Sequence, residues 1–181
     1  MLKHLTHSTV ITTVVVVAGL TGAASALAGS PTAHRAAGTS LPPCRTSDLS
    51  ARIMPGSPGA GQRYATLWLT NRTHHTCHTY GYVGMLFLDR HGHAMATDVV
   101  RDHNSLRPHR VVLAPGHKAG TLLHWTIVQG AGDSTGPCVT PPSRVEITPP
   151  DMRSHLIIRW AGGVVCQRGR VDVQPLVPVR G

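Results

Sequence analysis

The feature that most constrains the fold is an alternating segment followed by a cysteine-containing loop, within residues 63–84. Between positions 64 and 70, apolar and polar side chains alternate strictly. One face consists of Ala65, Leu67 and Leu69, and the other of Tyr64, Thr66, Trp68 and Thr70. This period of two is typical of a β-strand with one buried face. With Cys77 in the following loop, the segment predicts two strands of a small secreted β-sandwich, joined by a loop that is held by a disulfide.

Further strand-like segments follow along the chain, separated by glycine- and proline-rich turns. They cover residues 48–54, 64–70, 85–89, 93–97, 110–113, 118–127, 144–148, 155–160 and 170–174, with a less regular segment at 99–104. We find no convincing amphipathic helix. Short strands at this spacing are typical of an antiparallel sandwich or barrel. The sequence therefore predicts an all-β domain of about eight or nine strands.

The N-terminal segment, residues 1–28, has the features of a cleaved signal peptide. Lys3 precedes an apolar run over positions 10–24, and small residues before position 28 suit a cleavage site. The apolar run is shorter than the roughly 20 residues that span a bilayer, which disfavours the alternative of an uncleaved anchor. We predict a flexible linker over residues 29–43, a β-domain over 44–176 and a loose tail over 177–181. No transmembrane segment is expected after cleavage, so the protein would be secreted.

The cysteine pairing follows from the predicted hairpins. The four cysteines all lie after the signal peptide, and an even number in an exported chain indicates two disulfides. Cys44 and Cys77 flank the hairpin predicted from the first two strands, so they lie close together if that hairpin forms. Cys138 and Cys166 flank the hairpin of residues 144–160 in the same way. We therefore predict the disulfides Cys44–Cys77 and Cys138–Cys166.

Motifs along most of the mature chain resemble a family of secreted actinobacterial domains, the domain of unknown function 4232. They are Cys44, the segment from Tyr64 through Leu69-Thr70-Asn71 to Cys77, Gly81-Tyr82-Val83-Gly84, Leu113-Ala114-Pro115-Gly116, Leu123-His124-Trp125, Cys138, Thr148-Pro149-Pro150, and Cys166 before Arg170-Val171-Asp172-Val173. Val83 departs from the expected proline, and the loop around Cys77 is unusually rich in histidine. The resemblance implies an immunoglobulin-like sandwich and export, and it supplies no catalytic residues.

The charge of the chain points to acidic partners. The formal net charge is +9, and nearly all of it comes from scattered arginines. A basic exported protein is suited to anionic polymers of the cell envelope, so we expect association with the cell wall. The scatter of the arginines makes nucleic acid an unlikely partner. Codon bias of a GC-rich genome is the alternative explanation for the arginine content.

Two groups of histidines are candidate metal ligands. The first contains His74, His75 and His78, and the second contains His91 and His93. Imidazole suits zinc, copper or nickel. In the sequence, neither group is completed by a carboxylate or a free thiol. We therefore interpret these histidines as solvated loop residues and expect no cofactor, with a metal-binding protein or metalloenzyme as the alternative.

Signatures of catalysis are missing from the sequence. There is no Gly-x-Ser-x-Gly motif, and the predicted disulfides leave no cysteine nucleophile. The glycine-rich segment at 130–132 lacks the lysine of a phosphate-binding loop. Asn71-Arg72-Thr73 matches a glycosylation sequon but is more simply an asparagine at a strand end. We expect a binding or structural domain and no enzyme.

Two aromatic residues of the alternating strand form a candidate binding surface. Tyr64 and Trp68 project from the face opposite the apolar one. Side by side and exposed, they would make a platform for sugars or peptides. The alternative is that Trp68 packs under a neighbouring loop or strand. Trp125, by contrast, is predicted to lie in the core.

Overall fold

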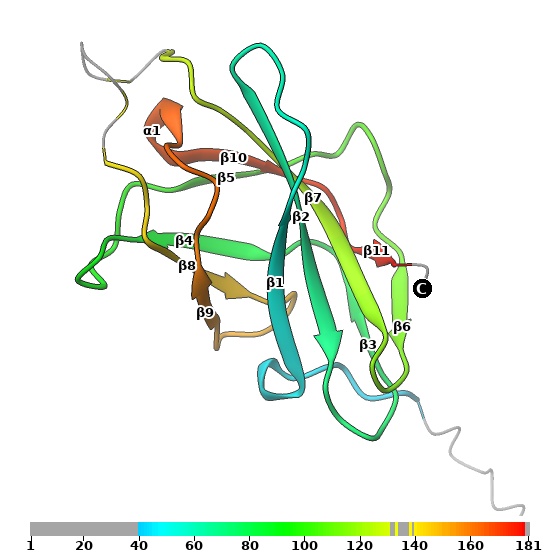
Figure 1. Ribbon diagram of the computed structural model, residues 1–181. Coiled ribbons are helices and arrows are strands. Elements are labelled where there is room, and N and C mark those ends of the chain that lie inside the picture. Colours follow the sequence, from blue (N-terminus) through cyan, green and yellow to red (C-terminus); the bar gives the residue numbers. More distant parts are fainter. Residues whose placement is uncertain (1–39, 131–132, 134–137, 139, 180–181) are drawn as a thin grey trace, which may run out of the picture. The chain divides into compact units, whose positions relative to one another are not determined.

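The computed structural model describes residues 40–130, 133, 138 and 140–179, and this part of the chain is mostly β-structure (Figure 1). The strands are β1 Leu49–Pro55, β2 Gln62–Asn71, β3 Cys77–Tyr80, β4 Gly84–Leu88, β5 Asp98–Arg101, β6 Arg110–Leu113, β7 Lys118–Thr126, β8 Arg144–Thr148, β9 Leu156–Arg159, β10 Arg170–Val173 and β11 Val177–Pro178. A 3₁₀ turn, η1 (Thr46–Asp48), precedes β1, and a short helical turn, α1 (Cys166–Gly169), precedes β10. The predicted signal peptide and the linker up to residue 39 lie outside the described residues.

The strands form three sheets around one core. The largest has the order β1-β2-β7-β10-β5, with β11 pairing with β7; β3 pairs with β6, and β4-β8-β9 form the third sheet (Figure 1). All pairs are antiparallel except β10 and β5, which run parallel. The predicted sandwich is confirmed, although it is not antiparallel throughout. A parallel pair requires a long connection, and almost seventy residues separate these two strands.

The alternation in β2 determines which face of this strand is buried in the core. Ala65 is 2% exposed, and Leu67 and Leu69 are fully buried, as the period of two predicts. The inward faces of the sheets meet at an aromatic cluster, where the Trp160 ring centre lies 4.8 Å from that of Phe87 on β4 and 5.0 Å from that of Trp125 on β7. Trp125 is 3% exposed, which confirms its predicted core position.

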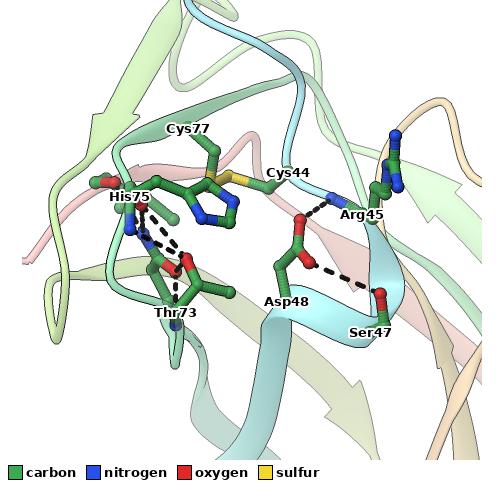
Figure 2. The surroundings of a disulfide bond; sticks show 9 residues. Cys44, Arg45, Ser47, Asp48, Thr73, His75 and Cys77 are labelled. Atoms are coloured by element: carbon green, nitrogen blue, oxygen red, sulfur yellow. Dashed lines mark hydrogen bonds between the residues drawn. A yellow bond between two sulfur atoms is a disulfide. The ribbon is translucent and has the colours of Figure 1, made fainter.

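Both predicted disulfides are present. The Cα atoms are 5.0 Å apart in Cys44–Cys77 and 5.3 Å apart in Cys138–Cys166. Figure 2 shows the first bond, which ties the segment before η1 to the start of β3, beside the loop that carries His75. Two backbone hydrogen bonds reinforce it: Cys44 N donates to His78 O at 2.8 Å, and His78 N donates to Pro42 O at 2.9 Å.

The strand expected at residues 93–97 does not form. Only an isolated bridge joins Leu88 to Ala94. The reason lies in the preceding turn, where Asp89 Oδ1 accepts hydrogen bonds from the backbone N–H groups of His91 and His93, each at 2.8 Å. These N–H groups are thereby satisfied by a side chain instead of a neighbouring strand.

The C-terminal segment was expected to become a loose tail after residue 176, and this expectation is wrong for its first residues. Leu176 is fully buried, and Val177–Pro178 form β11, in register with Gly120 and Ala119 of β7. Val179 N also donates to Lys118 O at 3.0 Å. Among the described residues, no helix is long and apolar enough to span a membrane.

Candidate functional site

One candidate site is a groove of about 380 Å³ on the outward face of the six-stranded sheet. We call it the sheet groove. Strand pairing creates it, because Tyr64 of β2 lies opposite His124 of β7, and His124 lies opposite Asp172 of β10. Directly opposed residues on neighbouring strands share a face, so these three side chains form one row. Arg101, Asp102 and Arg170 also line the groove.

Hydrogen bonds hold the middle of this row in place. His124 Nδ1 lies 3.3 Å from Asp172 Oδ2, and His124 Nε2 lies 2.8 Å from Gln62 Oε1. Asp172 Oδ1 accepts from Arg170 Nε at 3.3 Å and from Arg170 Nη2 at 3.1 Å. The imidazole nitrogen remote from the carboxylate therefore faces an amide oxygen and not a hydroxyl or thiol. In this arrangement His124 is not paired with a nucleophilic side chain, as the base of a catalytic triad would be.

Asp102 is one of the two aspartates that line the groove. Hydrogen bonds from the Ser105 hydroxyl and from the Asn104 backbone hold the pKa of Asp102 below its usual value of 3.8. Tyr82 Oη donates to the carbonyl oxygen of Asp102 at 3.1 Å, which fixes this turn against the core. Asp102 is therefore an ionised, positioned hydrogen-bond acceptor at neutral pH.

The two residues of the predicted aromatic platform lie on the same strand face but have different neighbours. Tyr64 is 37% exposed and stacks on His124, with ring centres 4.8 Å apart. Trp68 is half-buried, and Lys118 Nζ lies 4.9 Å from the centre of its ring. Tyr64 lines the sheet groove and Trp68 does not. The candidate surface is thus centred on Tyr64 and His124.

The histidines of the two predicted groups lie at separate places. His78 belongs to β3, and its Nε2 accepts a hydrogen bond from Arg110 Nη2 at 3.2 Å. His74 and His75 are exposed in the loop before β3. Among the described residues, three potential ligand atoms come within 4.8 Å of one another only at Asp133, Cys138 and Cys166, and both of these sulfurs belong to a disulfide.

The second histidine group does have a carboxylate beside it, contrary to our interpretation of the sequence. The rings of His91 and His93 stack with centres 5.9 Å apart, and His93 Nδ1 lies 3.4 Å from Asp89 Oδ2. Hydrogen bonds from the backbone of His93, together with that of His91, hold the pKa of Asp89 below 3.8. These three residues form an exposed turn with one acidic and two imidazole side chains.

A second candidate surface is a pair of arginines on the outward face of the three-stranded sheet. Arg144 of β8 and Arg159 of β9 are direct cross-strand partners. Among the described residues, neither has a carboxylate within ion-pair distance, and the nearby Glu146 lies 3.4 Å from His155. Like charges directly opposed on neighbouring strands destabilise a sheet. This arginine pair is therefore an uncompensated positive site.

The loop that carries Cys138 is anchored by Asp133. Its carboxylate accepts hydrogen bonds from the backbone N–H groups of Gly130 at 2.9 Å, Gln167 at 2.8 Å and Arg168 at 2.9 Å. Gln167 and Arg168 have positive φ angles of 54° and 56°, so two successive N–H groups converge on the carboxylate. These bonds hold the pKa of Asp133 below 3.8.

This anchor predicts a stability loss in acid. A carboxyl with a lowered folded-state pKa contributes stability that is present above 3.8 and lost as the pH falls further, through the folded-state value. The free energy of unfolding, measured by urea titration from pH 6 to about pH 2, is expected to fall more steeply below 3.8 in the wild type than in Asp133→Asn. If the free energy of unfolding fell equally steeply below pH 3.8 in the two proteins, the role of Asp133 would be contradicted.

Sequence reasoning located Tyr64 but missed its partners. His124, Asp172, Arg170 and Gln62 come from three strands. The first three lie in segments that carry the family resemblance, but the resemblance assigns them no binding role. The available signal was the polar alternation of residues 118–127, which places His124 on the outward face of its strand. That signal does not identify which residues lie beside it.

Comparisons with known proteins give the family of the chain. Neither the curated proteins nor the solved structures contain a match to this chain. A protein-family model matches residues 44–177, which is most of the chain and includes all four cysteines. The chain therefore belongs to the family described as domain of unknown function (DUF4232).

Proposed function

We propose that this protein is an exported, non-catalytic binding domain that associates with anionic polymers of the cell envelope. The two disulfides support export, because such bonds persist in oxidising compartments. The net charge of +9 supports an acidic partner. The observation that carries the proposal is the arginine pair, in which Arg144 and Arg159 oppose one another without a carboxylate partner among the described residues.

Two neighbouring guanidinium groups suit a phosphate or carboxylate group. Each guanidinium can donate two parallel hydrogen bonds to such an anion, and the anion would also remove the repulsion between the arginines. Arg144 reaches the turn at Gly92, where an added Cβ would lie 3.1 Å from its Nη2. The exposed side chains of His91 and His93 thus border the same site. A phosphodiester or uronate group of an envelope polymer matches this chemistry.

The double change Arg144→Gln and Arg159→Gln is expected to weaken binding about tenfold. The measurement is cosedimentation with cell-wall fragments, and binding of poly(glycerol phosphate), across a salt series. Wild-type binding should be lost at about half-molar salt, where exposed charges are screened beyond about 4 Å.

A matched control removes two charges elsewhere. Arg72 and Arg107 are both exposed, so Arg72→Gln with Arg107→Gln makes the same change in net charge outside the arginine pair. This control should retain most of the binding. Equal losses in the two double variants would show that net charge alone acts, and retention at half-molar salt would contradict the charge mechanism altogether.

The turn of His91, His93 and Asp89 supports a second candidate function, extracellular metal binding. The specific observation is that Asp89 Oδ2 lies 3.4 Å from His93 Nδ1, beside the stacked ring of His91. Elemental analysis of protein purified without a histidine tag distinguishes the two proposals. Stoichiometric zinc, copper or nickel that is lost in His91→Ala or His93→Ala would favour the metal function.

A further inference from the structure

The sheet groove differs in chemistry from the rest of this basic protein. Its lining includes two arginines, Arg101 and Arg170, and two aspartates, Asp102 and Asp172. The formal charges of these two arginines and two aspartates cancel, whereas the whole chain carries +9. A phosphate or a carboxylate would meet the two aspartates at close range. The groove is therefore suited to a ligand without net charge, unlike the arginine pair.

The polar groups of the groove offer both donors and acceptors after their internal bonds are made. Arg170 uses Nε and Nη2 on Asp172, which leaves Nη1 and one Nη2 hydrogen available. Asp172 Oδ1 accepts two hydrogen bonds from Arg170, whereas Oδ2 contacts only His124 Nδ1 and keeps a further lone pair. The Asn104 side chain also lines the groove and adds an amide. A hydroxyl group, which donates and accepts at once, matches such a surface.

An aromatic ring borders these polar groups. Tyr64 is 37% exposed, and its stacking on His124 at an interplanar angle of 21° fixes its orientation. The C–H faces of a sugar ring are apolar and pack on an aromatic ring while the hydroxyls bond to polar neighbours. Because Gln62 and Asp172 hold His124 from both sides, little side-chain freedom is lost when a ligand binds.

From these observations we infer that the sheet groove binds a neutral, polyhydroxylated ligand, namely a sugar unit of an uncharged glycan. Tyr64 supplies the stacking face. Arg170 and Asp172 hydrogen-bond to neighbouring hydroxyl groups, and Asp102 accepts from a further one. This site is separate from the arginine pair, which lies on another sheet, so the two proposals stand or fall independently.

The test is affinity electrophoresis in gels that contain neutral polysaccharides, with dextran, mannan, arabinan and galactan as probes. The wild-type protein should be retarded by at least one polymer, and about half-molar salt should not release it. Tyr64→Ala and Asp172→Asn should each weaken this binding about tenfold. Asp172→Asn preserves the side-chain shape, and Tyr64 is exposed, so both variants should keep the wild-type far-ultraviolet circular dichroism.

Tyr80→Ala is the matched control, because Tyr80 is 51% exposed on β3 and does not line the groove. It should bind as the wild type does. Absence of retardation by every polymer would overturn the inference, as would equal weakening in Tyr64→Ala and Tyr80→Ala. Binding that disappears in salt, or in the Arg144→Gln and Arg159→Gln double variant, would assign it to the arginine pair and overturn the groove as the site.

Discussion

Removing the Cys44–Cys77 bond through the changes Cys44→Ala and Cys77→Ala is expected to lower the free energy of unfolding by about 3–4 kcal/mol. The bond closes a loop with a sequence separation of 33, so the unfolded chain gains much conformational entropy without it. Both cysteines also belong to the core, at 3% and 1% exposed. Urea unfolding followed by circular dichroism measures the change, since the free energy extrapolates linearly to zero denaturant.

The second disulfide provides the matched comparison. Its sequence separation of 28 gives nearly the same chain-entropy contribution, also about 3–4 kcal/mol. Cys138 is only half-buried, however, whereas both sulfurs of the first bond lie in the core. Removal of Cys44–Cys77 should therefore cost more than removal of Cys138–Cys166. A decrease in the free energy of unfolding below about 1 kcal/mol for the first pair would contradict its predicted role as the more stabilising disulfide.

The order of strands near the disulfides was predictable because it depends on local pattern. The period of two in residues 64–70 defines which side chains are buried, and burial sets the register of β1 on β2. Once that hairpin forms, Cys44 and Cys77 must lie near each other. The same reasoning succeeded for Cys138 and Cys166, which flank the β8–β9 hairpin.

The sheet groove was not predictable from the sequence, because it depends on pairing between distant strands. Tyr64, His124 and Asp172 lie in one row only through the registers of β2 on β7 and of β7 on β10. A shift of one residue in either register would move a side chain to the other face. The parallel pairing of β5 with β10 adds Asp102 to the groove, and no local pattern indicates that pairing.

Local competition for hydrogen bonds explains the error at residues 93–97. The turn at residues 90–92 predicts a returning strand, but Asp89 satisfies the backbone of that turn. Thr97 Oγ1 accepts from Phe87 N at 2.9 Å, which replaces a strand-to-strand bond.

The arginine pair, in contrast, depends on a hairpin that the sequence does indicate. The β8–β9 hairpin was predicted, so the approach of Arg144 and Arg159 follows from its register.

Asn71→Ala is expected to lower the free energy of unfolding by about 2–4 kcal/mol, although it removes a polar side chain. Asn71 ends β2 and is fully buried. Its Nδ2 donates to His75 O at 2.8 Å and to Leu113 O at 2.9 Å, while Oδ1 accepts from Thr73 N at 2.9 Å and Thr73 Oγ1 at 2.7 Å. The alanine variant leaves the buried carbonyl oxygen of Leu113 without this donor, and unsatisfied buried groups are costly.

The matched control is Asn104→Ala, since Asn104 is an exposed asparagine and such surface changes are usually within about 0.5 kcal/mol. Thermal and urea unfolding of both variants measure the difference. Equal stability of the two would contradict the role of Asn71 as a polar anchor of the Cys77 loop.

Because both Nδ2 hydrogens are engaged in the folded protein, Asn71 also cannot serve as a glycosylation site there, despite the sequon that it begins. Mass spectrometry of the protein secreted from a glycosylating host should find Asn71 unmodified, and a glycan on Asn71 of the folded protein would refute this buried arrangement.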